Sequence, residues 1–197
     1  MASWQVGRVR VTRIVELEGA PISPEFLFAG VTREQVCRHT WLRPHYANDA
    51  GKLFMSIHAF VVESEGQQII VDTCVGHNKP RRVPGWNQLQ GTFLADLAAS
   101  GYPPANIDTV LCTHMHADHV GWNTRLVDGA WVPTFVNARY LFARKEWEHF
   151  ASEHWEEGVS DVIGDSVRPI LDAGLADLVE DDYRITGEVW LEPTPGR

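Results

Sequence analysis

The chain has 197 residues, 44% of them apolar, and a formal net charge of −9. This length favours a single domain over residues 1–197, and the composition is sufficient for a packed core and excludes a disordered chain. The acidic balance argues against a nucleic-acid partner, because phosphate binding needs clustered lysine and arginine. We interpret the one basic cluster, Lys79-Pro80-Arg81-Arg82, as a solvated loop.

The sequence also lacks the signals of export and of membrane insertion. No apolar run approaches the roughly 18 residues that a membrane span needs, and the first ten residues lack the apolar core of a signal peptide. We therefore expect a cytoplasmic protein with no membrane partner. Cys37, Cys74 and Cys112 are odd in number and form no CxxC pair, which favours reduced thiols.

In the N-terminal third, residues 4–16 predict one or two strands, and residues 32–42 predict a short helix that Thr32 caps. Residues 21–46 are rich in aromatic side chains, and this stretch either lines a substrate pocket or packs on the core. Two strands over 55–63 and 68–72 follow, and Glu65-Gly66 predicts the turn between them.

A helix over residues 92–100 precedes a strand over 107–112, so strand, helix and strand form a crossover unit with parallel strands. Such sheets place their sites at the carboxyl ends of the strands. Further along we expect strands at 131–135, 139–142, 178–179 and 189–191, and helices at 143–153 and 165–171. There is no internal repeat and no linker that would separate domains.

The strand over 107–112 leads directly into a cluster of metal-binding residue types. His114, His116, Asp118 and His119 lie within six residues. If the chain stays extended, residues 114, 116 and 118 face one side, and His119 enters from the next turn. The alternatives are a surface histidine patch and core histidines satisfied by backbone carbonyls, but burying these groups together without partners is costly.

Imidazole nitrogens with a carboxylate oxygen suit zinc, and iron or manganese are the nearest competitors. Four donors in so short a loop exceed what one ion with an open position would take, so we expect two ions. Such a pair, about 3.5–4 Å apart, lowers the pKa of bound water from 15.7 towards about 7, which favours hydrolysis. We interpret the remaining histidines as packing or surface residues: His39, His45, His58, His77, His149 and His154.

Asp72 ends a buried strand, where a carboxylate needs a polar or cationic neighbour. One interpretation is that it accepts a hydrogen bond from the second ring N–H of a ligating histidine, because ligating histidines usually donate that group to a carboxylate or carbonyl. The other is that it caps the turn at Val75-Gly76.

Thr113-His114-Met115-His116-Ala117-Asp118-His119 resembles the HxHxDH signature of the metallo-β-lactamase superfamily, and Ile70-Val71-Asp72-Thr73 with Gly76 resembles its preceding strand and turn. The resemblance runs from about Met55 to the end. Gly121-Trp122-Asn123 and Asn137-Ala138-Arg139-Tyr140 are similar to the branch that contains acyl homoserine lactonases and methyl parathion hydrolases.

The resemblance implies an α/β fold of the αββα sandwich type, of which this chain holds mostly the first half and the start of the second. It implies His114 and His116 on one zinc ion, Asp118 and His119 on the other, and Asp118 as the catalytic residue that orients a metal-bound hydroxide. The implied reaction is hydrolysis of a small-molecule ester, lactone or phosphoester. It names no substrate-binding residue.

One departure from the family pattern concerns the last residues. Members usually continue with a third histidine in a TPGH stretch, then a bridging aspartate and a further histidine. Here Pro193-Thr194-Pro195-Gly196 is followed by Arg197, and a guanidinium offers no lone pair to a cation. The chain is therefore expected to be truncated.

The alternatives are a catalytically incompetent remnant whose exposed sheet face favours homodimers, or a thioester hydrolase or persulfide dioxygenase of the same fold.

Overall fold

The computed structural model describes residues 2–152 and 161–194. Two compact units make up the chain: residues 1–14 with 58–197, and residues 15–57. Each unit is described by itself below, and the expectation of a single domain stays a prediction. Glu153 and His154, and the Pro195-Gly196-Arg197 end, lie outside the described residues.

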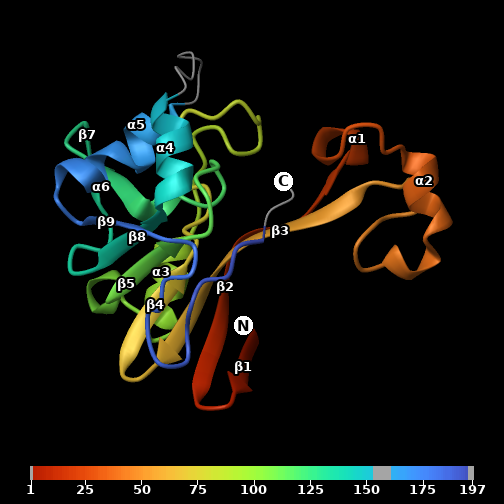
Figure 1. The fold of residues 1–197 in the computed structure, drawn as a ribbon. Helices are drawn as coiled ribbons and strands as arrows, with labels where there is room; N and C mark the ends of the chain where they lie inside the picture. Colours follow the sequence, from red (N-terminus) through yellow and green to blue (C-terminus); the bar gives the residue numbers. More distant parts are fainter. Residues whose placement is uncertain (1, 153–160, 195–197) are drawn as a thin grey trace. The chain divides into compact units, whose positions relative to one another are not determined.

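A seven-stranded mixed sheet in the order β1-β2-β3-β4-β5-β8-β9 organises the larger unit (Figure 1), and residues 15–22 of β2 and 53–57 of β3 belong to the smaller unit. The pairs β1/β2 and β3/β4 are antiparallel, whereas β4, β5, β8 and β9 are parallel. Its strands are β1 (Ala2–Val6), β2 (Val9–Ile22), β3 (Leu53–Ser64), β4 (Gln67–Val71), β5 (Thr109–Cys112), β8 (Arg139–Ala143) and β9 (Ala176–Val179). A separate hairpin consists of β6 (Thr124–Val127) and β7 (Ala130–Pro133).

The predicted hairpin between β3 and β4 is confirmed. Ser64 pairs with Gln67, which leaves Glu65 and Gly66 as a two-residue loop. Both have positive φ, 51° and 81°, as the favoured type I′ turn requires. The turn therefore sets the register between β3 and β4.

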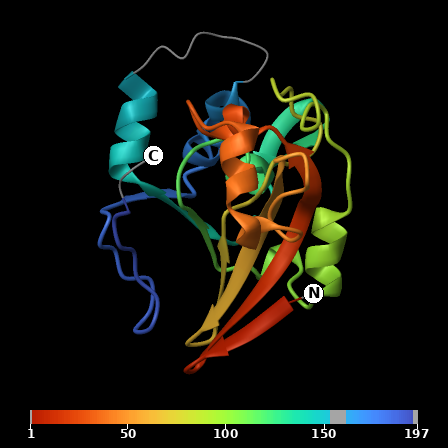
Figure 2. The ribbon, with the colours of Figure 1, turned by 90° about the vertical axis from the view of Figure 1, so that its right-hand side faces the viewer.

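The helices and 3-10 turns that the structure describes in the larger unit are α3 (Phe93–Ala99), η2 (Pro104–Asn106), η3 (Gly121–Asn123), α4 (Arg144–Ser152), α5 (Val162–Ser166) and α6 (Arg168–Asp172). In Figure 2 strands of the sheet run between α4, in cyan, and α3, in yellow-green. The mixed sheet with its flanking helices confirms the predicted fold class. Within residues 2–152 and 161–194, no helix is long and apolar enough to cross a membrane.

The single helix predicted over 165–171 is wrong, because the chain forms α5 and α6 with Val167 between them at φ −117° and ψ −50°. Pro169 lies in the first turn of α6. Since proline has no N–H, the helical bond from residue 169 to the carbonyl of Asp165 cannot form. One helix therefore becomes two short ones.

One face of the sheet holds a core of Ile69, Leu111, Leu141 and Val179, against which the C-terminal segment packs Ile185, Val189 and Leu191. We predicted a strand at 189–191, and this is wrong. The segment forms only an isolated bridge between Arg184 and Trp190, with Leu191 N–H donating to Tyr183 O at 2.9 Å. Its apolar side chains nevertheless cover the sheet as a strand would.

The smaller unit contains α1 (Pro24–Leu27), α2 (Arg33–Arg38) and the 3-10 turn η1 (Thr40–Leu42). Thr32 caps α2 as predicted, in a capping box with Gln35, although the helix ends at Arg38 rather than at residue 42. The expectation that its aromatic residues either line a pocket or pack on the core stays open. The side chains of Phe26, Phe28, Trp41 and Tyr46 are exposed within the described part of the chain.

Candidate metal centre

The residues predicted to bind metal lie on the loop that leaves β5. β4 and β5 are parallel neighbours in which Val71 stands opposite Leu111, so the two strands end side by side. Asp72 continues from β4, and its N–H donates to Leu111 O at 2.8 Å. The carboxylate and the histidine loop therefore meet at the carboxyl edge of the sheet, as the crossover unit predicts.

The carboxylate of Asp72 holds both ends of the histidine loop. Its Oδ1 accepts the backbone N–H of Thr113 at 2.8 Å, and its Oδ2 lies 2.8 Å from Nδ1 of His119. With the His119 Nδ1–H donated to Asp72, Nε2 is the nitrogen left with a lone pair for a cation. The contact is the one that the prediction for Asp72 required, and the role itself stays a prediction.

The three histidine rings of the loop lie against one another. The ring centroids of His114 and His119 are 3.9 Å apart, and those of His114 and His116 are 4.8 Å apart. Nδ1 of His114 lies 3.0 Å from Oγ1 of Thr113. The structure thus brings together the imidazoles that the sequence placed within six residues.

Asp118 and His119 each favour the charged form of the other. Burial alone would lower the pKa of His119, but the hydrogen bonds and charges of Asp118 and Asp72 outweigh it and raise that pKa from 6.5 to about 9. Burial would raise the pKa of Asp118, but the hydrogen bond and charge of His119 lower it. Because imidazole must give up its proton to bind a metal ion, binding of a cation at His119 would release this proton.

The geometry of this pair agrees with a zinc ion. Oδ2 of Asp118 lies 3.4 Å from Nε2 of His119. Two ligands of a tetrahedral zinc, each about 2.0–2.1 Å from the ion, are about 3.3–3.4 Å apart. As the side chains stand, no group of three or more His, Cys, Asp or Glu among the described residues is arranged to hold a metal ion. The donor types and one ligand pair fit the metal, and a third donor is not in place.

The other described histidines each contact an aromatic ring, in keeping with our interpretation of them as packing or surface residues. His77 lies against Trp122 with centroids 4.4 Å apart. The remaining contacts are His39 with Trp41, His45 with Tyr46, His58 with Phe60 and His149 with Phe150. His154 lies outside the described residues.

Our interpretation of the basic cluster as a solvated loop is wrong for two of its residues. Lys79 and Arg81 are buried, whereas Arg82 is exposed. Their carboxylate partner, Asp165, lies on α5 far along the chain. No local pattern around Lys79 indicates such a partner. The one signal in the sequence is Pro169, because a proline there leaves the backbone oxygen of Asp165 without its helical donor.

A family comparison gives the class of this fold. Residues 54–194 match the model of the metallo-beta-lactamase superfamily, so the chain belongs to that superfamily. An N-acyl homoserine lactonase from a Bacillus species is 26% identical to it over an alignment of 159 residues, which covers 73% of this chain and 55% of the relative. The chain thus spans about half the length of the curated relative it matches.

Solved structures show the same fold at low sequence identity. A probable metal-dependent hydrolase from Staphylococcus aureus superposes with a TM-score of 0.70 at 19% identity, over 93% of this chain and 63% of that one. The hydrolase AbOPH of the beta-lactamase superfamily gives 0.68 at 24% identity, over 94% and 62%. AidC, a dizinc quorum-quenching lactonase solved with a homoserine product, gives 0.62 at 14% identity, over 93% and 62%.

Proposed function

We propose that this chain belongs to a metal-dependent hydrolase of small-molecule esters, lactones or phosphoesters, and that a lactone is the first substrate to test. The observation that carries the proposal is the histidine loop at the carboxyl end of β5, with Asp72 bonded to Nδ1 of His119. Relatives named as lactonases support the choice of substrate.

In this proposal His114 and His116 hold one cation, and Asp118 and His119 hold the second. Zinc is the expected metal, because the donors are imidazoles and a carboxylate. The bound cations would act as a Lewis acid and lower the pKa of a water molecule.

The residues of the chain bind, orient and hold protons around that centre. Asp72 keeps the proton on Nδ1 of His119, which fixes the tautomer that leaves Nε2 for binding. Asp118 orients the attacking water as well as contributing an oxygen ligand, and is therefore the proposed catalytic residue. The apolar or aromatic group of the substrate stays unassigned.

The test combines metal binding with turnover. Zinc affinity, measured by competition with a chromogenic chelator, and hydrolysis of N-hexanoyl homoserine lactone and of an aryl ester are compared between the parent chain and His116→Ala. His45→Ala is the control, because His45 is exposed and lies outside the loop. We expect His116→Ala to lose zinc affinity and turnover and the control to keep both; equal behaviour of the two variants would defeat the proposal.

A second candidate is a fold that holds one ion weakly and does not turn over substrate. The observation that favours it is the lack of a three-donor group among the described residues. Metal analysis across a size-exclusion peak separates the two candidates. A monomer that retains two ions excludes the weak-binding candidate, whereas a peak that keeps no metal after loading with zinc excludes the first. Iron in place of zinc would point to thioester hydrolysis or persulfide oxidation instead.

A further inference from the structure

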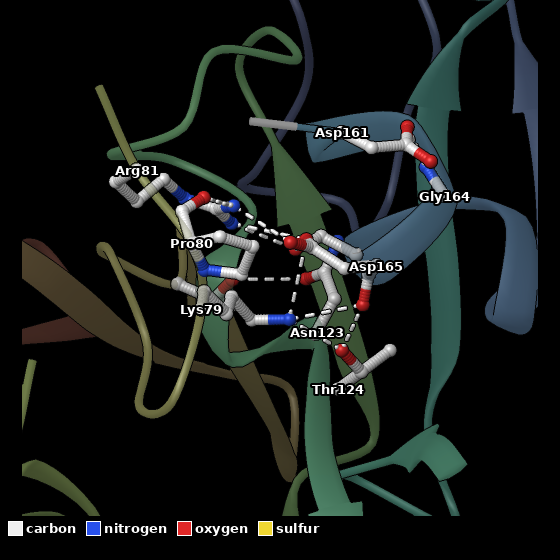
Figure 3. Close-up of polar contacts among 10 residues, drawn as sticks. Lys79, Pro80, Arg81, Asn123, Thr124, Asp161, Gly164 and Asp165 are labelled. Carbon is white, nitrogen blue, oxygen red and sulfur yellow. Dashed lines mark hydrogen bonds and ion pairs between the residues drawn. The ribbon is translucent and has the colours of Figure 1, made fainter. Parts of the chain in front are cut away.

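Two cations and one carboxylate are buried together beside the proposed metal centre. Lys79 and Arg81 come from the loop after β4, and Asp165 comes from α5; the three are 0%, 2% and 5% exposed. In Figure 3 the two cationic side chains point towards Asp165, with Thr124 below it. We call Lys79, Arg81, Thr124 and Asp165 the buried clamp.

Both cations of the buried clamp contact the carboxylate of Asp165, Lys79 at 3.4 Å from Oδ1, and Lys79 also donates to the backbone oxygen. Nζ of Lys79 donates to the backbone oxygen of Asp165 at 2.9 Å and to Oγ1 of Thr124 at 2.8 Å, and it lies 3.8 Å from the centre of the Trp131 ring. Arg81 donates to both carboxylate oxygens of Asp165, at 2.6 and 3.0 Å. The bidentate geometry is the strongest form of such a pair.

The backbone oxygen of Asp165 is available because of Pro169. That oxygen would ordinarily accept the N–H of residue 169 within a helix, and proline has none. The side chains of Lys79 and Thr124 donate to it instead. α5 is therefore attached to the loop after β4 and to the start of β6 through one carbonyl.

This arrangement is a poor way to gain stability. Two cations share one carboxylate, so the buried clamp holds an excess positive charge out of water, and burial lowers the pKa of Lys79 from 10.5 to about 7 against the opposing charge of Asp165. Buried ion pairs are often no better for stability than apolar residues of the same volume. Such a group can instead fix the relative position of the segments that it joins.

Two of the joined segments continue the loops that build the proposed metal centre: Lys79 lies in the loop after β4, and Thr124 follows the histidine loop. Thr73 N–H donates to His119 O at 2.7 Å, Trp122 N–H to Thr73 O at 2.8 Å, and Gly121 N–H to Cys74 O at 2.8 Å. These three bonds lie between the Asp72–His119 contact at one end and the Lys79–Thr124 bond at the other.

The two loops also approach closely at Gly121. A Cβ at this position would lie 1.9 Å from the backbone oxygen of Val75, so a side chain here would force the loops apart. The two loops can therefore pair only while the backbones at Gly121 and Val75 stay this close, and the Asp72–His119 and Lys79–Thr124 contacts lie on either side of this point.

We propose that Lys79, Thr124 and Asp165 are positioning residues, which hold the loop after β4 against the histidine loop and thereby set Asp72 against His119. The pairing of the loops stands on the contacts above. The consequence for metal affinity rests on the proposed function, so the test measures the two separately.

The test uses Thr124→Val, which keeps the side-chain shape and removes the hydroxyl, with Lys79→Met as a second variant that keeps the apolar stem. Thr124→Ser restores the hydroxyl and is the rescue variant. Ser64→Ala is the matched control, because it removes a buried hydroxyl bonded at 2.9 Å to Thr186, away from both loops.

The first readout is amide hydrogen exchange of Thr73, Gly121 and Trp122 by NMR in the metal-free chain. We expect these three amides to exchange about ten times faster or more in Thr124→Val, to recover in Thr124→Ser, and to match the parent in Ser64→Ala once global stability is accounted for. Unchanged exchange in Thr124→Val, or an equal increase at all amides, overturns the proposal. If Thr124→Val does not fold, Lys79→Met decides by the same criteria.

The second readout is zinc affinity by chelator competition. Loss of partners behind the ligands typically lowers metal affinity about 10- to 100-fold, and we expect a loss in this range for Thr124→Val with recovery in Thr124→Ser. Parent affinity in Thr124→Val overturns the link to the metal centre. If the parent chain binds no zinc, the proposed function fails, and the exchange readout alone decides whether the buried clamp positions the loops.

Discussion

Replacing Lys79 with methionine removes a charge that the fold buries, and the size of the effect follows from the environment of the amine. Lys79 faces Asp165, Arg81 and the ring of Trp131. Burial, with a smaller contribution from the Arg81 charge, lowers its pKa from 10.5 to about 7, while Asp165 acts in the opposite direction. At about 1.4 kcal/mol for each unit of pKa, keeping Lys79 charged in the folded chain costs about 5 kcal/mol.

The sign of the pH dependence is fixed by which state holds the proton. Between pH 7 and 10.5 the unfolded chain has Lys79 protonated and the folded chain does not, so unfolding takes up a proton. The free energy of unfolding therefore rises with pH in this window, by up to about 1.4 kcal/mol per pH unit. Below pH 7 both states are protonated, and the full cost is present.

The assay is urea denaturation of the parent and of Lys79→Met at pH 6.5, 7.5, 8.5 and 9.5, where the difference between the two chains cancels the other titrating groups. We expect the parent to gain stability relative to the variant as pH rises from 7 to 9.5. Lys145→Met is the control, because Lys145 is exposed and its pKa is raised by Asp181. A parent–variant difference that stays constant from pH 7 to 9.5 would refute the reasoning.

Three further predictions concern Asp72, Gly121 and the cysteines. Asp72→Asn should weaken zinc binding about 10- to 100-fold in a chelator competition, because Nδ1 of His119 loses its carboxylate partner; parent-like affinity would exclude that role. Gly121→Ala should lower the free energy of unfolding by about 1–3 kcal/mol or more in urea, because its Cβ would overlap the opposite backbone, and an unchanged midpoint would show that the loops yield freely. Burial raises the pKa of the Cys112 thiol, so at pH 8 a disulfide reagent should modify Cys112 only after unfolding and the less buried Cys37 before it; rapid loss of both thiols in the folded chain would contradict this.

The sequence predicts those parts of the fold whose causes are local. Glu65-Gly66 names the hairpin turn, the apolar run before His114 marks a buried strand, and Thr32 marks a helix start, and all three are found. The four residues of the histidine loop come from one short segment as well. These four side chains therefore lie near one another because they all follow the end of β5.

The parts that could not be predicted depend on partners far along the chain. Lys79 and Arg81 look like a solvated loop because their carboxylate lies 86 and 84 positions away. The periodicity of Val167, Ile170 and Leu171 favours one helix, and Pro169 overrules it. The apolar pattern of residues 189–191 is satisfied by burial against the sheet without the pairing that defines a strand.

The break between α5 and α6 has a consequence for how this region tolerates change. In an unbroken helix each backbone N–H donates to the carbonyl four residues earlier, and so excludes side-chain donors from that oxygen. Pro169 has no N–H to donate to the Asp165 carbonyl, so the ammonium group of Lys79, distant in the sequence, donates to it instead. Any residue other than proline at position 169 would reintroduce the rival donor, so the identity of a helix-breaking residue governs the anchoring of a loop that begins at the end of β4.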